Sequence, residues 1–318
     1  MLEPPVDSVL LLSFGGPEGP ADVRPFLENV TRGRGVPADR LDEVGQHYLD
    51  AFAGVSPLPE QCRRLRTALQ AELDLPVYWG NRNWHPMLAD TCAQMVADGR
   101  RHALVVTTSA FPSYSGCRQY REDLASPPGP VLTKLRNYWA EDGFLTPVRR
   151  KADVAAEGMA SPYLLFTAHS VPASMNACSG PSGRAYETAL RTAAARVADD
   201  RPWDLAWQSR SGPPHVPWLE PDVSDRLRSL AAEGVSEVVV VPIGFTSDHV
   251  EVVYDLDLVA VPGAPGGMTV RRAATVGTDP MFVAMLAGLV TERLAGVTHD
   301  DAELGLADTC PAGCCLAR

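Results

Sequence analysis

The fold class of this chain is decided by residues 238–257. They read Val238-Val239-Val240-Val241-Pro242-Ile243-Gly244-Phe245, then Thr246, then Ser247-Asp248-His249-Val250-Glu251-Val252-Val253-Tyr254-Asp255-Leu256-Asp257. The first eight residues are almost entirely apolar, which is typical of a strand buried on both faces of a sheet. A dense acidic cluster follows where such a strand delivers its carboxyl end, and ligands bind at that edge of open α/β sheets. The pattern predicts a functional site there.

Three carboxylates of this cluster share one face if residues 248–257 form a helix. Asp248, Glu251 and Asp255 are spaced by three and four residues, which places them on neighbouring turns. Like charges at that spacing repel each other, so the stripe requires either a cation or a well-solvated surface. Spacing alone leaves both interpretations open.

A histidine follows a second apolar run. Residues 163–168 read Tyr-Leu-Leu-Phe-Thr-Ala and are followed by His169-Ser170-Val171-Pro172. A lone histidine is more often a packed or capping residue than a catalytic one. His169, however, is expected at the same edge of the sheet as the carboxylates, which favours a functional role.

Strand-like runs alternate with helical patterns along the chain, which predicts an α/β fold with parallel sheets flanked by helices. With 318 residues, the chain is long enough for two domains. We expect the crossover between them near residue 148, beside the charged stretch 149–153. The strand-like runs lie at 8–14, 76–80, 103–108, 163–168, 205–208, 238–245 and, more weakly, from 268; the helical patterns lie at 61–72, 86–98, 186–198, 223–233 and 280–294.

Composition excludes several classes of function. The net charge of −11 makes nucleic acid an improbable partner. No apolar run approaches the roughly 20 residues that span a bilayer, so we expect no stable membrane insertion. The N-terminal residues carry no basic region before the apolar run 9–12, which argues against a signal peptide and predicts a cytoplasmic protein.

The cysteines are unevenly placed. Of the seven, three crowd the C-terminal tail, in the run Cys310-Pro-Ala-Gly-Cys314-Cys315. In a cytosolic protein such cysteines are metal ligands, catalysts or inert core residues more often than disulfides. Terminal tails are rarely buried unless they are tied down, so the tail cysteines are candidate metal ligands. Cys62 and Cys92 lie on helical patterns and are expected in the core.

Six motifs in order resemble the ferrochelatase family, in particular the actinobacterial coproporphyrin ferrochelatases. Each motif is weak alone, but the ordered set spans nearly the whole chain and is highly specific. The motifs are Ser13-Phe14-Gly15-Gly16-Pro17, Gly54-Val55-Ser56-Pro57-Leu58, Arg82-Asn83-Trp84-His85-Pro86, Ala168-His169-Ser170-Val171-Pro172, Trp207-Gln208-Ser209-Arg210 with Val216-Pro217-Trp218-Leu219, and Ser247-Asp248-His249-Val250-Glu251.

The resemblance implies two similar Rossmann-like domains, each with a four-stranded parallel sheet flanked by helices, and a porphyrin cleft between them. We expect an N-terminal domain of residues 1–147, completed by the C-terminal helix and tail at 280–318. Residues 148–279 would form the second domain, which carries the candidate catalytic residues.

The resemblance also implies insertion of Fe(II) into a porphyrin with loss of two protons. His169 and Glu251 would face each other across the macrocycle, as the residues that accept protons or bind iron. Which of the two does which is left open by the sequence. Asp248, His249 and Asp255 would support Glu251. The residues expected to bind the porphyrin are Phe14, Arg32, Arg34, Ser56, Arg82 and Trp218, with ordinary core packing for Trp218 and exposed loop arginines for Arg32 and Arg34 as the alternatives.

Two positions depart from the family pattern. Val259 stands where many members have a second carboxylate after Asp255, which makes an outer metal site doubtful. Phe14 stands where some coproporphyrin enzymes have a tyrosine that binds iron, and phenylalanine has no ligand atom.

Some family members hold a [2Fe–2S] cluster with one mid-chain cysteine and three near the C-terminus. Here Cys117, Cys310, Cys314 and Cys315 would supply the four thiolates, although adjacent ligands are unusual and Cys178 could replace one of them. Structural zinc is the alternative.

The expected substrate is coproporphyrin III. Its product, coproheme, would pass to a decarboxylase, and the protein is expected to be a monomer. The alternatives are a protoporphyrin IX ferrochelatase, a cobalt or nickel chelatase for a reduced tetrapyrrole, and a non-catalytic tetrapyrrole carrier or iron-sulfur sensor of the same fold.

Overall fold

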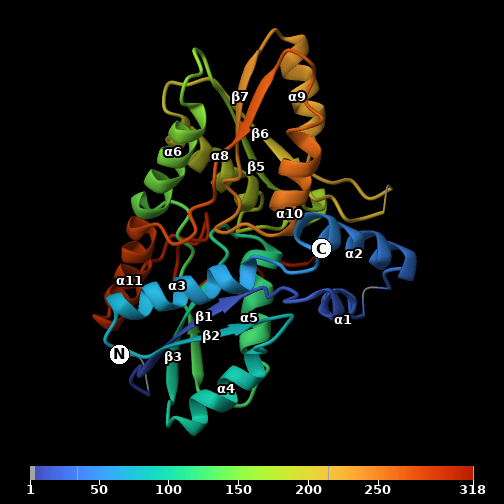
Figure 1. The fold of residues 1–318 in the computed structure, drawn as a ribbon. Helices are drawn as coiled ribbons and strands as arrows, with labels where there is room; N and C mark the ends of the chain where they lie inside the picture. The colour runs from blue at the N-terminus through green and yellow to red at the C-terminus, as the bar shows by residue number, and fades with distance from the viewer. Residues whose placement is uncertain (1–3, 34, 214, 318) are drawn as a thin grey trace. The chain divides into compact units, whose positions relative to one another are not determined.

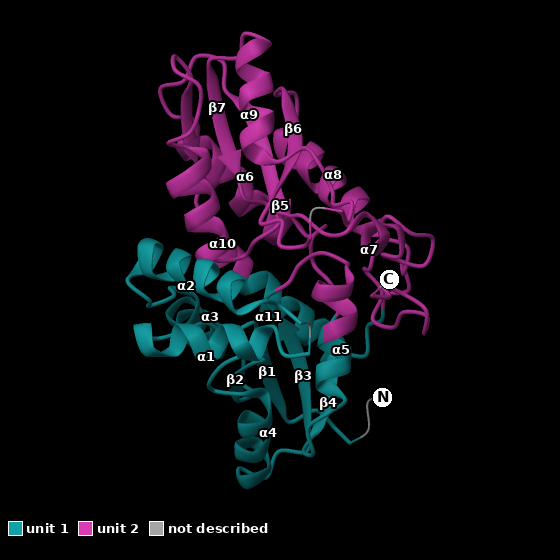
Figure 2. Ribbon diagram, turned by 90° about the vertical axis from the view of Figure 1, so that its right-hand side faces the viewer, with its two compact units in different colours: residues 1–108, 120–135, 283–298 teal, residues 109–119, 136–282, 299–318 magenta. Residues whose placement is uncertain are grey.

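The structure is a computed structural model that describes residues 4–33, 35–213 and 215–317 (Figure 1). The chain forms two compact units. Unit 1 comprises residues 1–108, 120–135 and 283–298, and unit 2 comprises residues 109–119, 136–282 and 299–318 (Figure 2).

Unit 1 is built on a four-stranded parallel sheet with strand order β2-β1-β3-β4. The strand β1 is buried along its whole length, as the apolar run 8–14 predicts. The strands are β1 (Ser8–Ser13), β2 (Val77–Asn81), β3 (His102–Thr107) and β4 (Val131–Lys134); the helices are α1 (Pro20–Val30), α2 (Ala38–Phe52), α3 (Leu58–Glu72), α4 (Leu88–Ala97) and α5 (Gln119–Leu124).

Unit 2 repeats this topology, with strand order β6-β5-β7-β8 and parallel pairing throughout. The predicted fold class, α/β with two four-stranded parallel sheets flanked by helices, is therefore confirmed. The strands are β5 (Tyr163–His169), β6 (Trp203–Gln208), β7 (Glu237–Val241) and β8 (Thr269–Arg272). The helices are α6 (Asp142–Ala156), α7 (Ala173–Ala177), α8 (Ala185–Ala198), α9 (Val223–Ala232) and α10 (Val250–Val252), with two π-helices, η1 (Tyr114–Arg118) and η2 (Val253–Ala260); α11 (Pro280–Leu294) crosses from unit 2 into unit 1.

The strand expected at 238–245 ends at Val241, because Pro242 has no N–H to donate to a sheet ladder. The remaining apolar residues of the run are still buried, among them Ile243 and Phe245. An apolar run thus marked burial correctly but overstated the length of the strand.

One face of the unit 2 sheet is covered by α9, α10 and η2. Leu165 and Val240 of the sheet belong to one apolar cluster with Leu227 of α9, and with Val252 and Leu256, which lie between the acidic residues of the cluster. Val252 and Leu256 are fully buried. The segment that carries the candidate carboxylates is therefore anchored to the sheet by its apolar side chains.

The expected crossover near residue 148 lies within helix α6, and the tail after residue 298 belongs to unit 2. The charged stretch 149–153 is part of this helix, and its residues range from exposed to buried. Units defined by compact packing need not fold independently, so the expected domain boundaries stay a prediction. Among the described residues, no helix combines the length and apolar character needed to cross a bilayer.

Truncation of the unit 2 core should destabilise the protein. We expect Leu165→Ala to lower the free energy of unfolding by about 2–5 kcal/mol, because the cavity it leaves lies in a fully buried cluster. The matched control is Leu258→Ala in η2, whose side chain is 45% exposed and whose loss should cost about 0.5 kcal/mol or less. Thermal unfolding followed by circular dichroism checks both, and equal shifts would contradict the proposed core.

Candidate active site

His169 is the last residue of β5, an inner strand of the unit 2 sheet. Its ring Nδ1 donates a hydrogen bond to the carbonyl oxygen of Ser170, which fixes a proton on that nitrogen. The other ring nitrogen, Nε2, lies 3.2 Å from Oε1 of Glu251. The residue therefore presents one ring nitrogen to the acidic segment, with its ring orientation set by its own backbone.

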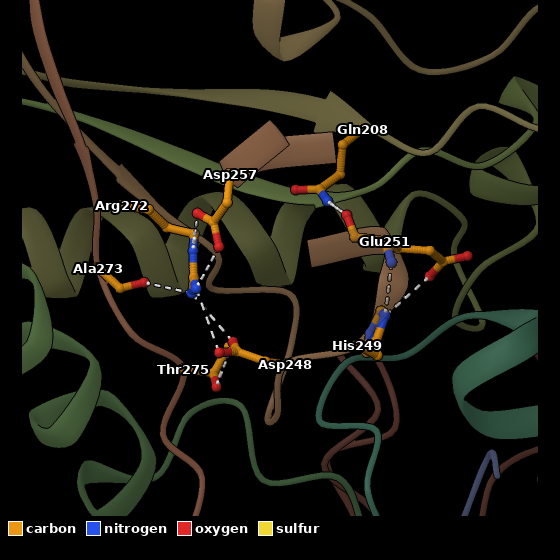
Figure 3. Close-up of polar contacts among 8 residues, drawn as sticks. All are labelled: Gln208, Asp248, His249, Glu251, Asp257, Arg272, Ala273 and Thr275. Carbon is orange, nitrogen blue, oxygen red and sulfur yellow. Dashed lines mark hydrogen bonds and ion pairs between the residues drawn. The ribbon is translucent and has the colours of Figure 1, made fainter. Parts of the chain in front are cut away.

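Glu251 lies in the three-residue helix α10, and its backbone is held from two directions (Figure 3). The ring Nδ1 of His249, at the N-cap, accepts the backbone N–H of Glu251 at 3.2 Å. The side-chain amide of Gln208, at the end of β6, donates to the carbonyl oxygen of Glu251. His169 and Gln208 are register partners in adjacent strands, so strand pairing itself brings the supports of the two groups together.

The electrostatics of His169 and Glu251 favour an ion pair. Burial alone would lower the pKa of His169, but the Glu251 carboxylate outweighs burial and raises the pKa to about 9. Burial would likewise raise the pKa of Glu251, but the positive charge and hydrogen bond of His169 lower it to about 2. The two side chains are 31% and 41% exposed. At neutral pH the structure therefore holds a protonated imidazole against an ionised carboxylate.

Asp255 is a second carboxyl group beside this pair. It lies four residues after Glu251, in η2, and accepts a hydrogen bond from the hydroxyl of Ser209. Burial, together with the negative charge of Glu251, raises the pKa of Asp255 to about 6. The site thus contains a carboxyl group poised to gain or lose a proton near neutral pH.

Asp248 does not share the helix face with Glu251 and Asp255. Helix α10 begins only at Val250, so Asp248 lies before the helix, and its carboxylate pairs with Arg272 of β8 at 3.2 Å (Figure 3). The proposed three-carboxylate stripe is therefore reduced to two members, because the helical segment is shorter than its spacing suggested.

Three further residues at this site were not recognised from the sequence. The hydroxyl of buried Tyr186, in α8, donates to the carbonyl oxygen of His169 at 2.9 Å. Gln208 holds Glu251, and its own Oε1 is buried without a hydrogen-bond partner among the described residues, as is Oγ1 of Thr167. Gln208 lies within one of the recognised motifs, whereas Tyr186 falls in an ordinary helical pattern and gave no signal.

The expected porphyrin-binding residues of unit 1 differ in exposure. Phe14 and Arg32 are exposed. Arg82 is only 5% exposed, pairs with Asp123 and stacks on the ring of Tyr120 at 4.5 Å. Buried Ser56 accepts the N–H of Leu58 at the start of α3. Arg34 lies outside the described residues. Within unit 1, Arg82 and Ser56 therefore already have structural partners.

Trp218, in unit 2, is half-buried near the His169 loop. Its backbone pairs with that of Pro172, three residues after His169. A side chain at Gly212 would collide with the indole, because a Cβ there would lie 2.5 Å from Nε1. The indole Nε1 is buried and has no hydrogen-bond partner in the part of the chain that the structure describes.

The sequence model of the ferrochelatase family matches residues 6–294. The chain belongs to the ferrochelatase family. Its relatives include the coproporphyrin III ferrochelatase of Streptomyces coelicolor, 49% identical over 99% of this chain and 94% of the relative. That of Frankia alni is 53% identical over 90% of this chain and 80% of the relative. A protein of Rhodopirellula baltica named ferrochelatase is 47% identical over 98% of this chain and 94% of the relative.

Solved chelatase structures share the fold. The sirohaem-biosynthesis enzyme CbiX superposes with a TM-score of 0.53 at 18% identity, covering 89% of this chain and 98% of its own. SirB from Bacillus subtilis, with Fe3+, superposes with a TM-score of 0.54 at 10% identity, covering 92% and 96%. At these identities the likeness supports the chelatase fold alone.

This ferrochelatase-family chain also packs the four predicted cysteine ligands together in unit 2. Cys117, Cys314 and Cys315 form a buried cluster, with Cys310 partly buried against it. The sulfurs of Cys314 and Cys315 lie 3.6 Å apart, and the N–H of Gly180 donates to the sulfur of Cys315 at 3.3 Å. No group of three or more His, Cys, Asp or Glu side chains within the described ranges is arranged to hold a metal ion.

Removal of the Glu251 charge should lower the pKa of His169. In Glu251→Gln, burial is opposed only by the smaller influences of the Ser170 carbonyl oxygen and the Asp255 charge, so the pKa of His169 should fall well below about 9. Because the raised pKa of His169 and the lowered pKa of Glu251 both stabilise the folded state, the wild-type pair should contribute most between pH 4.5 and pH 6.5. Its contribution should be lost as pH rises through about 9 and as pH falls towards about 2. Titration of 15N-labelled histidine by NMR measures the pKa directly.

The control for this titration is Asp255→Asn, because the charge of Asp255 contributes less to the pKa of His169 than that of Glu251. It should shift the pKa in the same direction by a smaller amount. A His169 pKa that is unchanged in Glu251→Gln would contradict the ion pair.

Proposed function

We propose that this protein inserts ferrous iron into coproporphyrin III, giving coproheme and releasing two protons. The observation that carries the proposal is the contact between His169 and Glu251 at the carboxyl ends of buried parallel strands. Relatives about half identical over nearly the whole chain are named coproporphyrin III ferrochelatases, which supports this porphyrin over protoporphyrin IX.

Metal insertion requires a base for the two pyrrole N–H protons, and we assign that role first to Glu251. It is ionised at neutral pH, and loss of the His169 proton, whose charge holds the pKa of Glu251 low, would make the carboxylate a stronger base. Asp255, with its pKa near 6, is suited to take the proton onward. The hydroxyl of Ser209 supports the ionised form of Asp255 by donating to it.

Iron is a substrate here, and His169 and Glu251 supply the imidazole and carboxylate donors that suit Fe(II). An imidazole binds a metal only in its neutral form, so iron must displace the proton that His169 holds in the ion pair. Iron binding and proton binding therefore compete at His169. The hydrogen bond from Nδ1 to the carbonyl oxygen of Ser170 would keep the imidazole oriented through this exchange, while Tyr186 holds the backbone carbonyl of His169.

We further propose that the reaction takes place in the cytoplasm, in keeping with seven cysteines that are all free thiols. Coproheme would then be a product for a downstream decarboxylase.

We also propose that Cys117, Cys310, Cys314 and Cys315 hold a [2Fe–2S] cluster. The donor set fits such a cluster in kind and number, since four thiolates ligate it. The N–H of Gly180 directed at the sulfur of Cys315 would stabilise that thiolate. When bound, the cluster would tie the C-terminal tail covalently to η1. Structural zinc would suit the same four sulfurs.

Iron insertion should be visible as loss of the free-base porphyrin absorbance bands under anaerobic conditions with ferrous iron. We expect fast loss with coproporphyrin III and little with protoporphyrin IX. Both His169→Ala and Glu251→Gln should lower kcat by about 10²–10⁴, because each removes a group that handles protons or iron. The matched control is Glu233→Gln, at the end of α9, where the side chain is 53% exposed and should not affect turnover.

The outcomes of this assay separate the alternatives. Preference for protoporphyrin IX would indicate a protoporphyrin IX ferrochelatase. Turnover only with cobalt or nickel would indicate a cobalt or nickel chelatase. Tight porphyrin binding with no turnover of any metal would indicate a carrier. Full activity in both His169→Ala and Glu251→Gln would rule out the proposed site.

The cluster proposal predicts iron and inorganic sulfide in protein purified without oxygen, at about two of each per chain. Cys117→Ser should lose both, together with the visible absorbance of the cluster. Cys62→Ser, at a buried cysteine of α3, should keep them. Zinc without sulfide would favour the structural zinc site, and full iron and sulfide in Cys117→Ser would contradict the assignment of that ligand.

A further inference from the structure

Arg272, the last residue of β8, is held between two carboxylates (Figure 3). Its side chain is 15% exposed. The guanidinium binds Asp257 through two contacts, Nε to Oδ1 at 2.6 Å and Nη2 to Oδ2 at 2.8 Å. It binds Asp248 through Nη1 to Oδ1 at 3.2 Å and Nη2 to Oδ2 at 3.4 Å. One partly buried cation therefore joins two anionic side chains.

The two carboxylates bracket Glu251 along the chain. Asp248 precedes Glu251 by three residues, and Asp257, in η2, follows it by six. The hydroxyl of Thr275 also donates to Oδ1 of Asp248, at 3.1 Å. Arg272 and Thr275 thus fix both ends of the segment that carries Glu251, from the side of β8.

This segment needs such support because its own helical structure is weak. Helix α10 has three residues and continues as a π-helix, η2. A single helical turn is marginal in water, and π-helices are rare and recur at functional sites. Val252 and Leu256 anchor the apolar side of the segment, but the carboxylate of Glu251 is half-exposed and packing alone does not hold it.

We propose that Arg272 is a positioning residue: by clamping Asp248 and Asp257, it holds the α10–η2 segment so that the Glu251 carboxylate faces His169. The effect on turnover rests on the proposed function, whereas the effect on the segment does not. Arg272 touches neither reacting group and acts through the backbone between its two partners.

The geometry calls for arginine in particular. A planar guanidinium presents a fixed fork of donors that matches a carboxylate with two parallel hydrogen bonds, and its remaining N–H groups reach a second partner. A lysine ammonium carries the same charge but is a point donor on a flexible stem. Arg272→Lys therefore keeps the charge and removes the clamp.

The test compares Arg272→Lys with Arg271→Lys. Arg271 is the adjacent residue of β8, is exposed, and donates to backbone carbonyl oxygens of Ala155 and Glu157. We expect Arg272→Lys to lower kcat with coproporphyrin III and ferrous iron about 10- to 100-fold, the size of effect that misplacement of a reacting group by about 1 Å produces. The KM for the porphyrin should stay within about twofold, since the loss falls on the chemical step.

Hydrogen exchange followed by mass spectrometry provides a readout that does not depend on turnover. Peptides that cover residues 248–260 should exchange faster in Arg272→Lys, while peptides of β5 and β6 should exchange as in the wild type. Arg271→Lys should match the wild type in both measurements. Unchanged exchange in 248–260, or an unchanged kcat, would overturn the proposal.

Two further variants address the case in which Arg272→Lys folds poorly. Asp257→Asn removes one side of the clamp and should reproduce the fall in kcat, and adding it to Arg272→Lys should cost little more, because both changes break one interaction. Loss of kcat together with porphyrin binding in every variant would show general destabilisation and would overturn the positioning role. If the wild type showed no turnover, but residues 248–260 still exchanged faster in Arg272→Lys than in the wild type, only the proposed function would be disproved.

Discussion

The ion pair between the imidazole of His169 and the carboxylate of Glu251 is the interaction on which the candidate site depends. Two opposite charges 3.2 Å apart are stable in a partly desolvated site only if hydrogen bonds fix both partners. The structure supplies them to each side separately. Ser170 and Tyr186 hold His169, and His249 and Gln208 hold the backbone of Glu251. The surrounding fold therefore fixes the orientation of the pair as well as its position.

The register of the parallel sheet carries most of this arrangement. His169 and Gln208 end adjacent strands as direct partners, so one strand supplies the imidazole and the next supplies the amide that reaches Glu251. The apolar residues around Glu251 then seat its segment on the same face of the sheet. A shift of one residue in β6 would turn Gln208 to the opposite face and remove that support.

The sequence was informative where a structural rule acts locally. Uninterrupted apolar runs identified the central strands of both sheets, and the polar residues that follow those runs gave His169 and Glu251 as candidates, which the structure brings within 3.2 Å of each other. It was uninformative where a contact joins distant segments. The carboxylate of Asp248 is directed by Arg272, 24 residues later, and no spacing near Asp248 encodes that choice. Strand β4 is short and half-exposed, so no apolar run marks it, and Tyr186 looks like any aromatic residue on a buried helix face.

The ion pair that orders the site also opposes iron binding, because it stabilises the protonated form of His169. In the proposed reaction, iron would reach the imidazole of His169 only after the imidazole had lost its proton, and the carboxylate paired with that imidazolium is also the base assigned to the porphyrin. Fe(II) carries a positive charge of its own, so in that proposal it would replace the imidazolium as the partner of the ionised Glu251 carboxylate. Asp255, with a pKa near 6, lies four residues after Glu251, in η2, and would accept a proton without a loss of that pairing. Separate roles for the two carboxyl groups, one paired with a cation and one free to titrate, follow from their environments rather than from their chemistry.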